Sequence, residues 1–193
     1  LFSKGDRVAL VEFDSTARLL GDSRNPWVDA GDKRLLISVA GKASAEGAFT
    51  DFRIALEKSC DLLRGVPADY RRFVLLLTDG VLEPNPLDSR YSPHDVLYRM
   101  AMMKAGPAER RAINEEYREK LVPVAERIIA DELVPRLKAD RIEIYSVGLG
   151  RRVDKNFLDR LAEDISCTPA EQHCFCAERA TDLVDVFARS LQY

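Results

Sequence analysis

Apolar and polar positions follow two different periods along the 193-residue chain, and the alternation of these periods outlines a fold. Short runs of apolar and β-branched residues predict strands, whereas apolar residues that recur every three or four positions predict amphipathic helices. The strand pattern covers residues 6–13, 71–80, 140–150 and 173–177, with a short antiparallel strand expected at 15–21. The helical pattern covers residues 32–43, 50–65, 153–164 and 179–192.

Strands that alternate with helices indicate a parallel α/β sheet, because parallel strands are joined by right-handed crossover connections. The fold class that we expect is a doubly wound, mostly parallel, Rossmann-like sheet flanked by helices, in one domain that spans residues 1–193. Residues 73–77 are all apolar, which predicts a strand buried on both faces. Thr50 and Gly65 are the expected caps of helix 50–65.

Residues 81–139 form a connection that is much longer than one crossover helix requires. Helical patterns at 92–106 and 107–139 predict that this connection is an enlarged helical insertion. Pro107 suits a first helical turn. Three methionines, Met100, Met102 and Met103, would either pack the insertion onto the body or offer an adaptable surface to a partner, and we expect packing.

Composition and charge reduce the number of function classes that fit this chain. The net charge is −3 and the pI is about 5.6, so no basic field points to nucleic acid. No apolar run approaches the roughly 18 residues of a membrane span. The two histidines, His94 and His173, come without a G-x-S-x-G motif or another catalytic pattern, so we do not expect an enzyme.

Two oxygen-bearing side chains are expected at the carboxyl edge of the sheet, where open parallel sheets bind ligands. Asp79 follows strand 71–80, and Thr50 lies in the loop that opens helix 50–65. A hydroxyl and a carboxylate are hard donors that suit Mg²⁺ or Mn²⁺. The alternative for Asp79 is a turn aspartate that only organises its own loop.

The order of these segments resembles a von Willebrand factor A-type domain. The resemblance rests on the family's second strand, its threonine loop, its fourth strand, its fifth strand with the following helix, and its last strand and helix. The matching residues are GDRVALVEFDSTA at 5–17, EGAFTDFRIAL at 46–56, RRFVLLLTDG at 71–80, 137–164 and 174–191.

The resemblance implies a metal-ion-dependent adhesion site, in which Thr50 and Asp79 match the family's threonine and aspartate. The metal, Mg²⁺ or Mn²⁺, keeps an open position that an acidic side chain of a protein partner fills. The family's Asp-x-Ser-x-Ser motif is absent from this chain, since residues 14–18 lack the last serine and residues 88–92 carry Arg90 in the middle. The resemblance therefore implies that the first strand and site loop precede Leu1, and that the chain lacks the central strand of its sheet.

The expected function is protein–protein interaction through this divalent metal. A metal-independent assembly scaffold is the alternative, and a phosphatase-like hydrolase is less favoured. Compact, bacterial-looking members of the family suggest a location outside the cytoplasm on a membrane anchor. We expect Cys60 to be buried, and a disulfide from Cys167 to Cys174 or Cys176 is an open alternative to free thiols.

Overall fold

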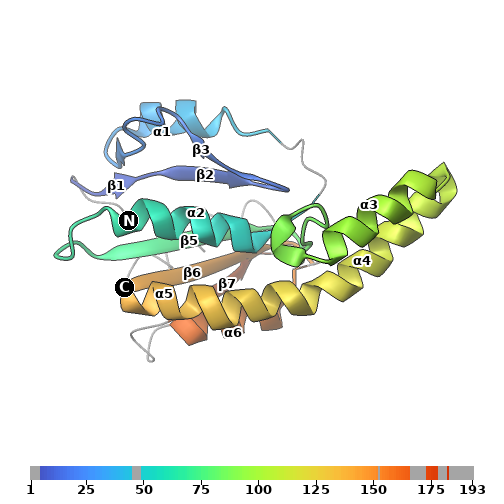
Figure 1. Cartoon of the computed structure of the whole chain (residues 1–193). Helices are drawn as coiled ribbons and strands as arrows, with labels where there is room; N and C mark the ends of the chain where they lie inside the picture. The colour runs from blue at the N-terminus through green and yellow to red at the C-terminus, as the bar shows by residue number, and fades with distance from the viewer. Residues whose placement is uncertain (1–4, 45–48, 152, 166–172, 178–181, 183–193) are drawn as a thin grey trace.

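The computed structural model describes residues 5–44, 49–151, 153–165, 173–177 and 182 (Figure 1). A parallel sheet flanked by helices confirms the expected fold class. The strands are β1 (Arg7–Val8), β2 (Leu10–Phe13), β3 (Ala17–Leu20), β4 (Val28–Asp29), β5 (Arg72–Thr78), β6 (Ile142–Leu149) and β7 (Cys174–Ala177). The helices are α1 (Lys33–Ala40), α2 (Phe52–Arg64), α3 (His94–Lys104), α4 (Pro107–Ile128), α5 (Val134–Ala139) and α6 (Lys155–Ile165).

The main sheet has the order β5-β6-β7, and both pairs of strands are parallel. The predicted antiparallel strand is confirmed as β3, which pairs with β2 in a separate two-stranded sheet. The predicted strand 6–13 is divided at Ala9, because its first part, β1, pairs with β4 and its second part, β2, pairs with β3.

β5 forms one edge of the main sheet, because it pairs with β6 alone among the described strands. Helix α2 contacts both β2 and β5 and so holds the two sheets together (Figure 1). The prediction that residues 73–77 are buried on both faces holds only for Leu76: Phe73, Val74 and Leu75 are half-buried, and Leu77 is 40% exposed on the strand that has one partner among the described strands.

The main hydrophobic core lies between the sheet and helices α2, α4, α5 and α6. Phe52 is central to it, since its ring lies 6.0 Å from that of Phe13 and 5.9 Å from that of Phe157. Helix α2 therefore packs against the hairpin on one side and against α6 on the other. Cys60, on the same helix, is fully buried, as predicted.

The enlarged crossover is confirmed as a helical segment. Helix α4 begins at Pro107 and continues through a π-helical turn, η2 (Ile129–Leu133), into α5. Helix α3 folds back on α4, and the two project from the body as a hairpin (Figure 1). The expected packing of the methionines is wrong for Met100 and Met103, which are 51% and 85% exposed, because α3 turns its opposite face toward α4.

Two predictions involve residues outside the described part of the chain. Of helix 179–192 only Asp182 is described, so that helix stays a prediction. Cys167 is also outside the described residues, and neither Cys174 nor Cys176 is part of a disulfide, so the disulfide alternative is not formed in this structure. Among the residues that the structure describes, no helix combines the length and the apolar character needed to cross a membrane.

Candidate functional site

The two predicted site residues, Thr50 and Asp79, lie on segments that are joined by backbone hydrogen bonds at the carboxyl end of β5. Thr50 directly precedes the residue that caps α2, and Asp79 directly follows β5. The Thr50 amide donates to the Glu83 carbonyl at 3.2 Å, and the Glu83 amide donates to the Thr50 carbonyl at 2.9 Å. This antiparallel bridge fixes the threonine loop against the segment that leaves Asp79.

The Thr50 side chain reaches the residue next to Asp79. A Cβ atom added to Gly80 would lie 3.7 Å from Thr50 Oγ1, which is an ordinary van der Waals contact. The Asp79 side chain is exposed and makes no hydrogen bond or ion pair with the described residues. The Thr50 hydroxyl thus lies near Gly80, the residue after Asp79, and the joint binding of a metal by Thr50 and Asp79 stays a prediction.

The hairpin turn between β2 and β3 lies at the same rim. The Asp14 carbonyl accepts from the Asp51 amide at 3.1 Å, and the Ser15 carbonyl accepts from Asn85 Nδ2 at 3.3 Å. The Asp14 carboxylate is used inside its own turn, where Oδ1 accepts from the Thr16 amide at 2.8 Å. No group of three or more His, Cys, Asp or Glu residues suited to a metal occurs among the described residues.

The prediction that Thr50 caps α2 is wrong, because Asp51 is the capping residue. Asp51 Oδ1 accepts from the Arg53 amide at 3.1 Å. An aspartate is a stronger cap than a threonine, and it satisfies one of the amides that a helix start leaves without a partner. This assignment leaves the Thr50 hydroxyl available at the rim.

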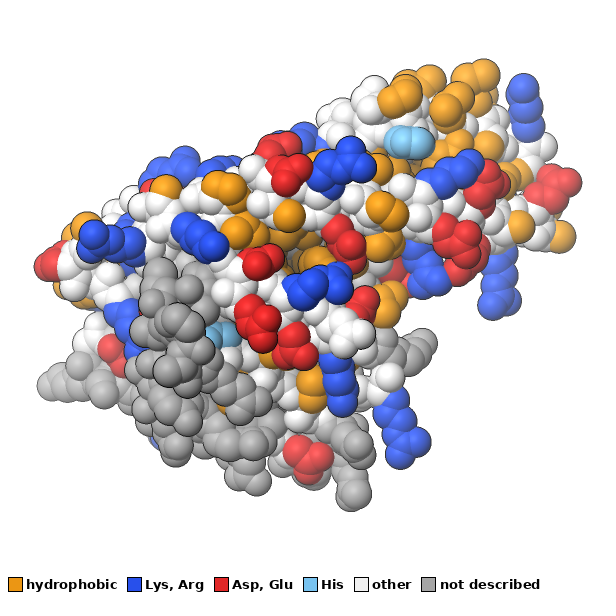
Figure 2. All heavy atoms as spheres, turned by 90° about the horizontal axis from the view of Figure 1, so that it is seen from below, with side chains coloured by type: hydrophobic (Ala, Val, Ile, Leu, Met, Phe, Trp, Pro, Cys, Tyr) orange, Lys and Arg blue, Asp and Glu red, His pale blue; other side chains and the backbone are white. Residues whose placement is uncertain are grey.

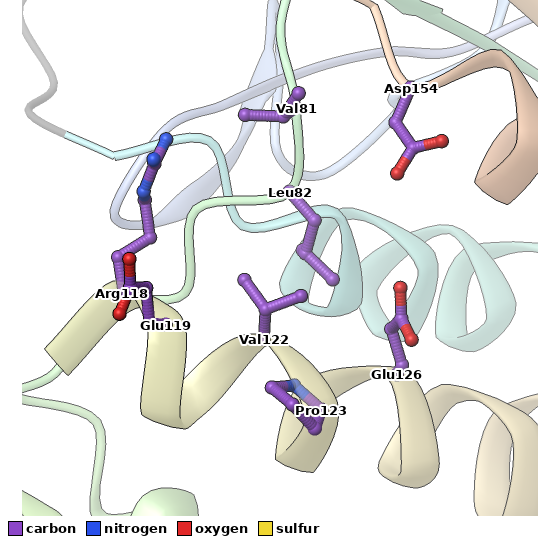
Figure 3. Close-up of a pocket in the computed structure, with 8 residues that line it drawn as sticks. All are labelled: Val81, Leu82, Arg118, Glu119, Val122, Pro123, Glu126 and Asp154. Carbon is purple, nitrogen blue, oxygen red and sulfur yellow. The ribbon is translucent and has the colours of Figure 1, made fainter. Parts of the chain in front are cut away.

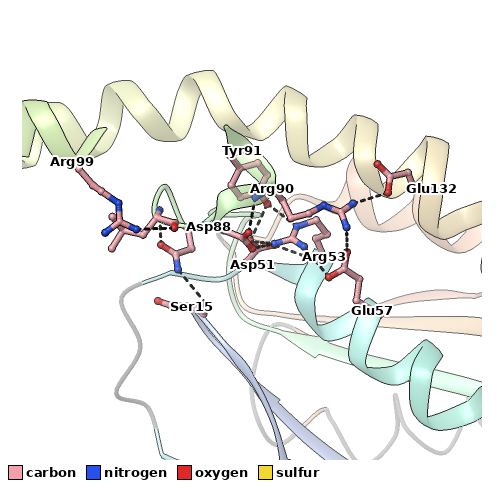
Figure 4. Close-up of polar contacts among 11 residues, drawn as sticks. Ser15, Asp51, Arg53, Glu57, Asp88, Arg90, Tyr91, Arg99 and Glu132 are labelled. Atoms are coloured by element: carbon pink, nitrogen blue, oxygen red, sulfur yellow. Dashed lines mark hydrogen bonds and ion pairs between the residues drawn. The ribbon is translucent and has the colours of Figure 1, made fainter. Parts of the chain in front are cut away.

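A buried charged cluster, which sequence reasoning missed, lies directly behind the rim (Figure 4). Arg53 is 1% exposed and Asp51 is 0% exposed. The Arg53 guanidinium pairs with Glu57 at 2.8 Å, with Asp88 and with Asp51 at 3.6 Å. The Tyr91 hydroxyl accepts from Arg53 Nε at 3.1 Å and donates to Asp51 Oδ2 at 2.9 Å. These five residues are called the Arg53 cluster below.

Burial and the neighbouring charges shift the pKa values of three groups in this cluster. Burial raises the pKa of the Asp51 carboxyl, against the opposing effect of the Arg53 charge. Burial also raises the pKa of the Tyr91 hydroxyl, and the Asp51 charge acts in the same direction. Burial alone would lower the pKa of Arg53, but the hydrogen bond that Arg53 donates to Tyr91 and the charge of Asp51 outweigh it and raise that pKa.

The Arg53 cluster holds the start of the helical insertion against α2. Asp88 and Tyr91 belong to the short helix η1 (Ser89–Tyr91) and its cap, which follow the rim segment. Arg90 extends the contact, since it pairs with Glu57 at 3.4 Å and with Glu132 at 2.6 Å. The segment after Asp79 is therefore held by the Thr50 bridge at one end and by buried charges at the other.

Two signals in the sequence point to this cluster. Asp51 stands directly before Phe52, the first apolar residue of the predicted helix, which is a typical capping position. Arg53 then lies between Phe52 and Ala55, on the apolar side of the same helix, where a charge is buried only if it is paired. The partners Asp88 and Tyr91 are more than thirty positions away, and no local pattern identifies them.

A groove of about 350 Å³ begins at Val81 and Leu82, just beyond the rim (Figure 3). Helix α4 forms its opposite wall, and Asp154 lies at the end away from Arg118 (Figure 3). Arg118 is held at the other end by an ion pair with Glu83 at 3.3 Å. The groove is lined by Val81, Leu82, Arg118, Glu119, Val122, Pro123, Glu126 and Asp154.

Comparisons with known proteins agree with this architecture. No family model and no curated protein matches the chain. A solved structure described as von Willebrand factor type A from Catenulispora acidiphila aligns with 96% of the chain, with a TM-score of 0.59 and 14% identity. The fold is of the von Willebrand factor A type. Two structures of proximal thread matrix protein 1 from the mussel byssus align with 97% and 98% of the chain, with TM-scores of 0.55 and 0.52 and 14% identity in each.

The chain spans about a third of the length of these solved chains, 33% in the first and 36% in the other two. At this level of identity the likeness concerns the A-type fold alone.

Proposed function

We propose that this chain is a protein-binding domain that recognises its partner at the rim formed by Thr50 and Asp79, through a divalent cation. The observation that carries the proposal is the approach of the Thr50 hydroxyl to Gly80, the residue that follows the exposed Asp79: a Cβ atom added to Gly80 would lie 3.7 Å from Thr50 Oγ1. The A-type fold supports it, because ligands of open α/β sheets bind at this edge.

The donor set fits Mg²⁺ with most of its hydration retained. Mg²⁺ favours six oxygen ligands and commonly binds through one or two carboxylates while keeping several waters. Thr50 would offer a neutral hydroxyl, and Asp79 would offer one negative charge. A cation held by so few protein charges remains attractive to an acidic side chain, so the favoured partner residue is an aspartate or a glutamate. When bound, the ion would supply a positive charge with an open coordination position.

Isothermal titration with Mn²⁺ tests this proposal, with Mg²⁺ as a competitor. We expect Asp79→Asn to weaken Mn²⁺ binding about tenfold or more, because the charged ligand proposed for the ion is lost. Thr50→Val should weaken it less, because a neutral ligand is lost. Asp69→Asn is the matched control, since Asp69 is an exposed aspartate before β5, at the other end of the same strand. Equal binding by Asp79→Asn and the parent would refute the metal site.

A metal-independent assembly scaffold is the second candidate. It is favoured by the lack of a three-residue metal-binding group in the described part of the chain, and by the rigid support that the Arg53 cluster gives to the rim. A scaffold would bind its partner equally well in EDTA and in Mg²⁺. A metal-dependent domain would lose its partner in EDTA and regain it when Mg²⁺ is restored.

A further inference from the structure

Helix α3 is apolar on two opposite faces, although only one of them is covered by the described residues. Its inner face packs on α4, where the Tyr98 ring lies 5.2 Å from the Tyr117 ring and the Tyr98 hydroxyl donates to Asn114 at 2.7 Å. Its outer face exposes Val96, Leu97, Met100 and Met103 by 52%, 50%, 51% and 85%. Figure 2 shows hydrophobic side chains gathered at this projecting end, beside a histidine. A helix with two apolar faces normally packs against other elements on both of them.

The exposed apolar residues follow the spacing of a helix–helix contact. Val96, Met100 and Met103 are separated by four and then three positions, with Pro93 and Pro107 continuing the pattern on either side. Alternation of three and four is the spacing of the a and d positions in a coiled coil. We call Val96, Met100 and Met103 the α3 seam. Such a narrow stripe is better suited to contact the side chains of another helix than to contact a partner with a broad, flat surface.

One basic residue flanks the seam on each side. Arg99 and Lys104 occupy the g and e positions beside it, and within the described residues neither pairs with a carboxylate. The hairpin tip from 94 to 111 carries four basic and two acidic residues, whereas the whole chain has a net charge of −3. A partner that covers the seam would therefore meet positive charge on both sides.

We propose that the α3 seam binds an amphipathic helix of another protein, with apolar residues along its contact stripe and acidic residues beside them. Flanking charges select the partner in helix pairs, so glutamates or aspartates opposite Arg99 and Lys104 favour binding. A second copy of this chain is disfavoured, since it would place basic side chains against basic side chains. This surface lies on the projecting hairpin, requires no cation, and is independent of the function proposed for the rim.

The test uses a fluorescent synthetic peptide of three heptads, with leucine at a and d and glutamate at e and g. A matched peptide carries lysine at e and g. By fluorescence anisotropy at low salt, we expect the chain to bind the glutamate peptide about tenfold or more tightly than the lysine peptide. Arg99→Glu combined with Lys104→Glu should reverse this preference, which a loss of folding would not produce.

A second set of variants tests the seam itself. Met100→Gln combined with Met103→Gln should weaken binding of the glutamate peptide about tenfold, because the apolar contact is lost. Ile37→Gln is the matched control, since Ile37 is 73% exposed on α1 and should leave the affinity unchanged. Asp79→Asn and EDTA should have no effect, which separates this result from failure of the rim proposal.

Three outcomes would overturn the inference. The first is equal affinity for the two peptides, or no binding of either. The second is a dimer of the chain in sedimentation equilibrium that Met100→Gln with Met103→Gln converts to a monomer, because the seam would then belong to a second copy. The third is stronger binding to vesicles of phosphatidylcholine and phosphatidylglycerol than to the glutamate peptide, lost in the same variant, because the face would then serve a membrane.

Discussion

Two aspartates near the same edge of the sheet have opposite surroundings. Asp51 is 0% exposed and contacts Arg53, Tyr91 and the Asn85 amide, whereas Asp79 is exposed and has no partner among the described residues. A buried carboxylate is tolerated only when hydrogen bonds and opposite charges from neighbouring groups replace its lost hydration. Asp51 therefore serves the fold, and Asp79 remains available to a ligand.

The difference also explains how an open site can be held in place. Thr50 and Asp51 are consecutive, so the Arg53 cluster fixes the backbone that presents the Thr50 hydroxyl. A binding site supported by buried, fully bonded groups needs little ordering when its ligand arrives. We interpret the cluster as the support and the rim as the recognition surface.

The largest expected effect is on the cluster. Arg53→Met would leave Asp51 buried without its cation, and loss of one partner of a buried pair costs about 3–5 kcal/mol of unfolding free energy. Urea denaturation followed by circular dichroism measures this loss. Arg64→Met is the control on the same helix, because the Arg64 side chain is 53% exposed, and it should change stability by less than about 0.5 kcal/mol. A similar loss in both variants would show that Arg53 has no special role.

The hydroxyl of Tyr91 should have the next largest effect. Tyr91→Phe removes the one group that bonds both Arg53 and Asp51, and a buried hydrogen bond to a charged group contributes about 1.5–3 kcal/mol. Tyr70→Phe is the control, since Tyr70 is 58% exposed and should be neutral in the same denaturation experiment. An unchanged midpoint for Tyr91→Phe would mean that the cluster does not depend on this link.

A smaller effect concerns the pH dependence of stability. The raised pKa of Asp51 means that the folded protein holds this proton more tightly than the unfolded chain does. The resulting stabilisation is complete below the ordinary pKa of 3.8 and is lost as the pH rises through the raised value. The side chain of Asp51→Asn cannot ionise, so this variant lacks that pH dependence. The unfolding free energy of the variant minus that of the parent should therefore be larger at neutral pH than at pH values below 3.8. A constant difference between the two proteins across this range would contradict the raised pKa.

The smallest effect is expected at the rim. Asp79→Asn and Thr50→Val should each change the unfolding free energy by less than about 0.5 kcal/mol, because Asp79 has no partner in the described structure and only the backbone of Thr50 is bonded. Thermal unfolding measures this directly. A loss comparable to that of Tyr91→Phe would place Asp79 among the residues that hold the fold together.

Local patterns were sufficient for most of the fold. The apolar run before Asp79 predicts β5, and the helical spacing from Phe52 to Leu63 predicts α2. The exposure of Leu77 could not be predicted in this way, because it depends on which strand lies beside β5 and not on the residues of β5. The division of strand 6–13 between two partners has the same cause.

Only the rim residues of the candidate site, Thr50 and Asp79, could be predicted from the sequence. Thr50 and Asp79 stand at strand and helix ends, which sequence can locate. Arg53 depends on Asp88 and Tyr91, and those contacts arise only when the long insertion folds back on α2. The exposure of Met103 likewise follows from which face of α3 meets α4, and both faces of that helix are apolar.

The most direct test of the rim is paramagnetic broadening of backbone amide signals by Mn²⁺ in a two-dimensional NMR spectrum. Binding by Thr50 and Asp79 predicts that the earliest broadening centres on residues 50 and 79–83, disappears in Asp79→Asn and is reversed by excess Mg²⁺. The amide of Asp69, before the other end of β5, should stay sharp. Broadening centred on the acidic side chains of α4, or no site-specific broadening, would contradict the account.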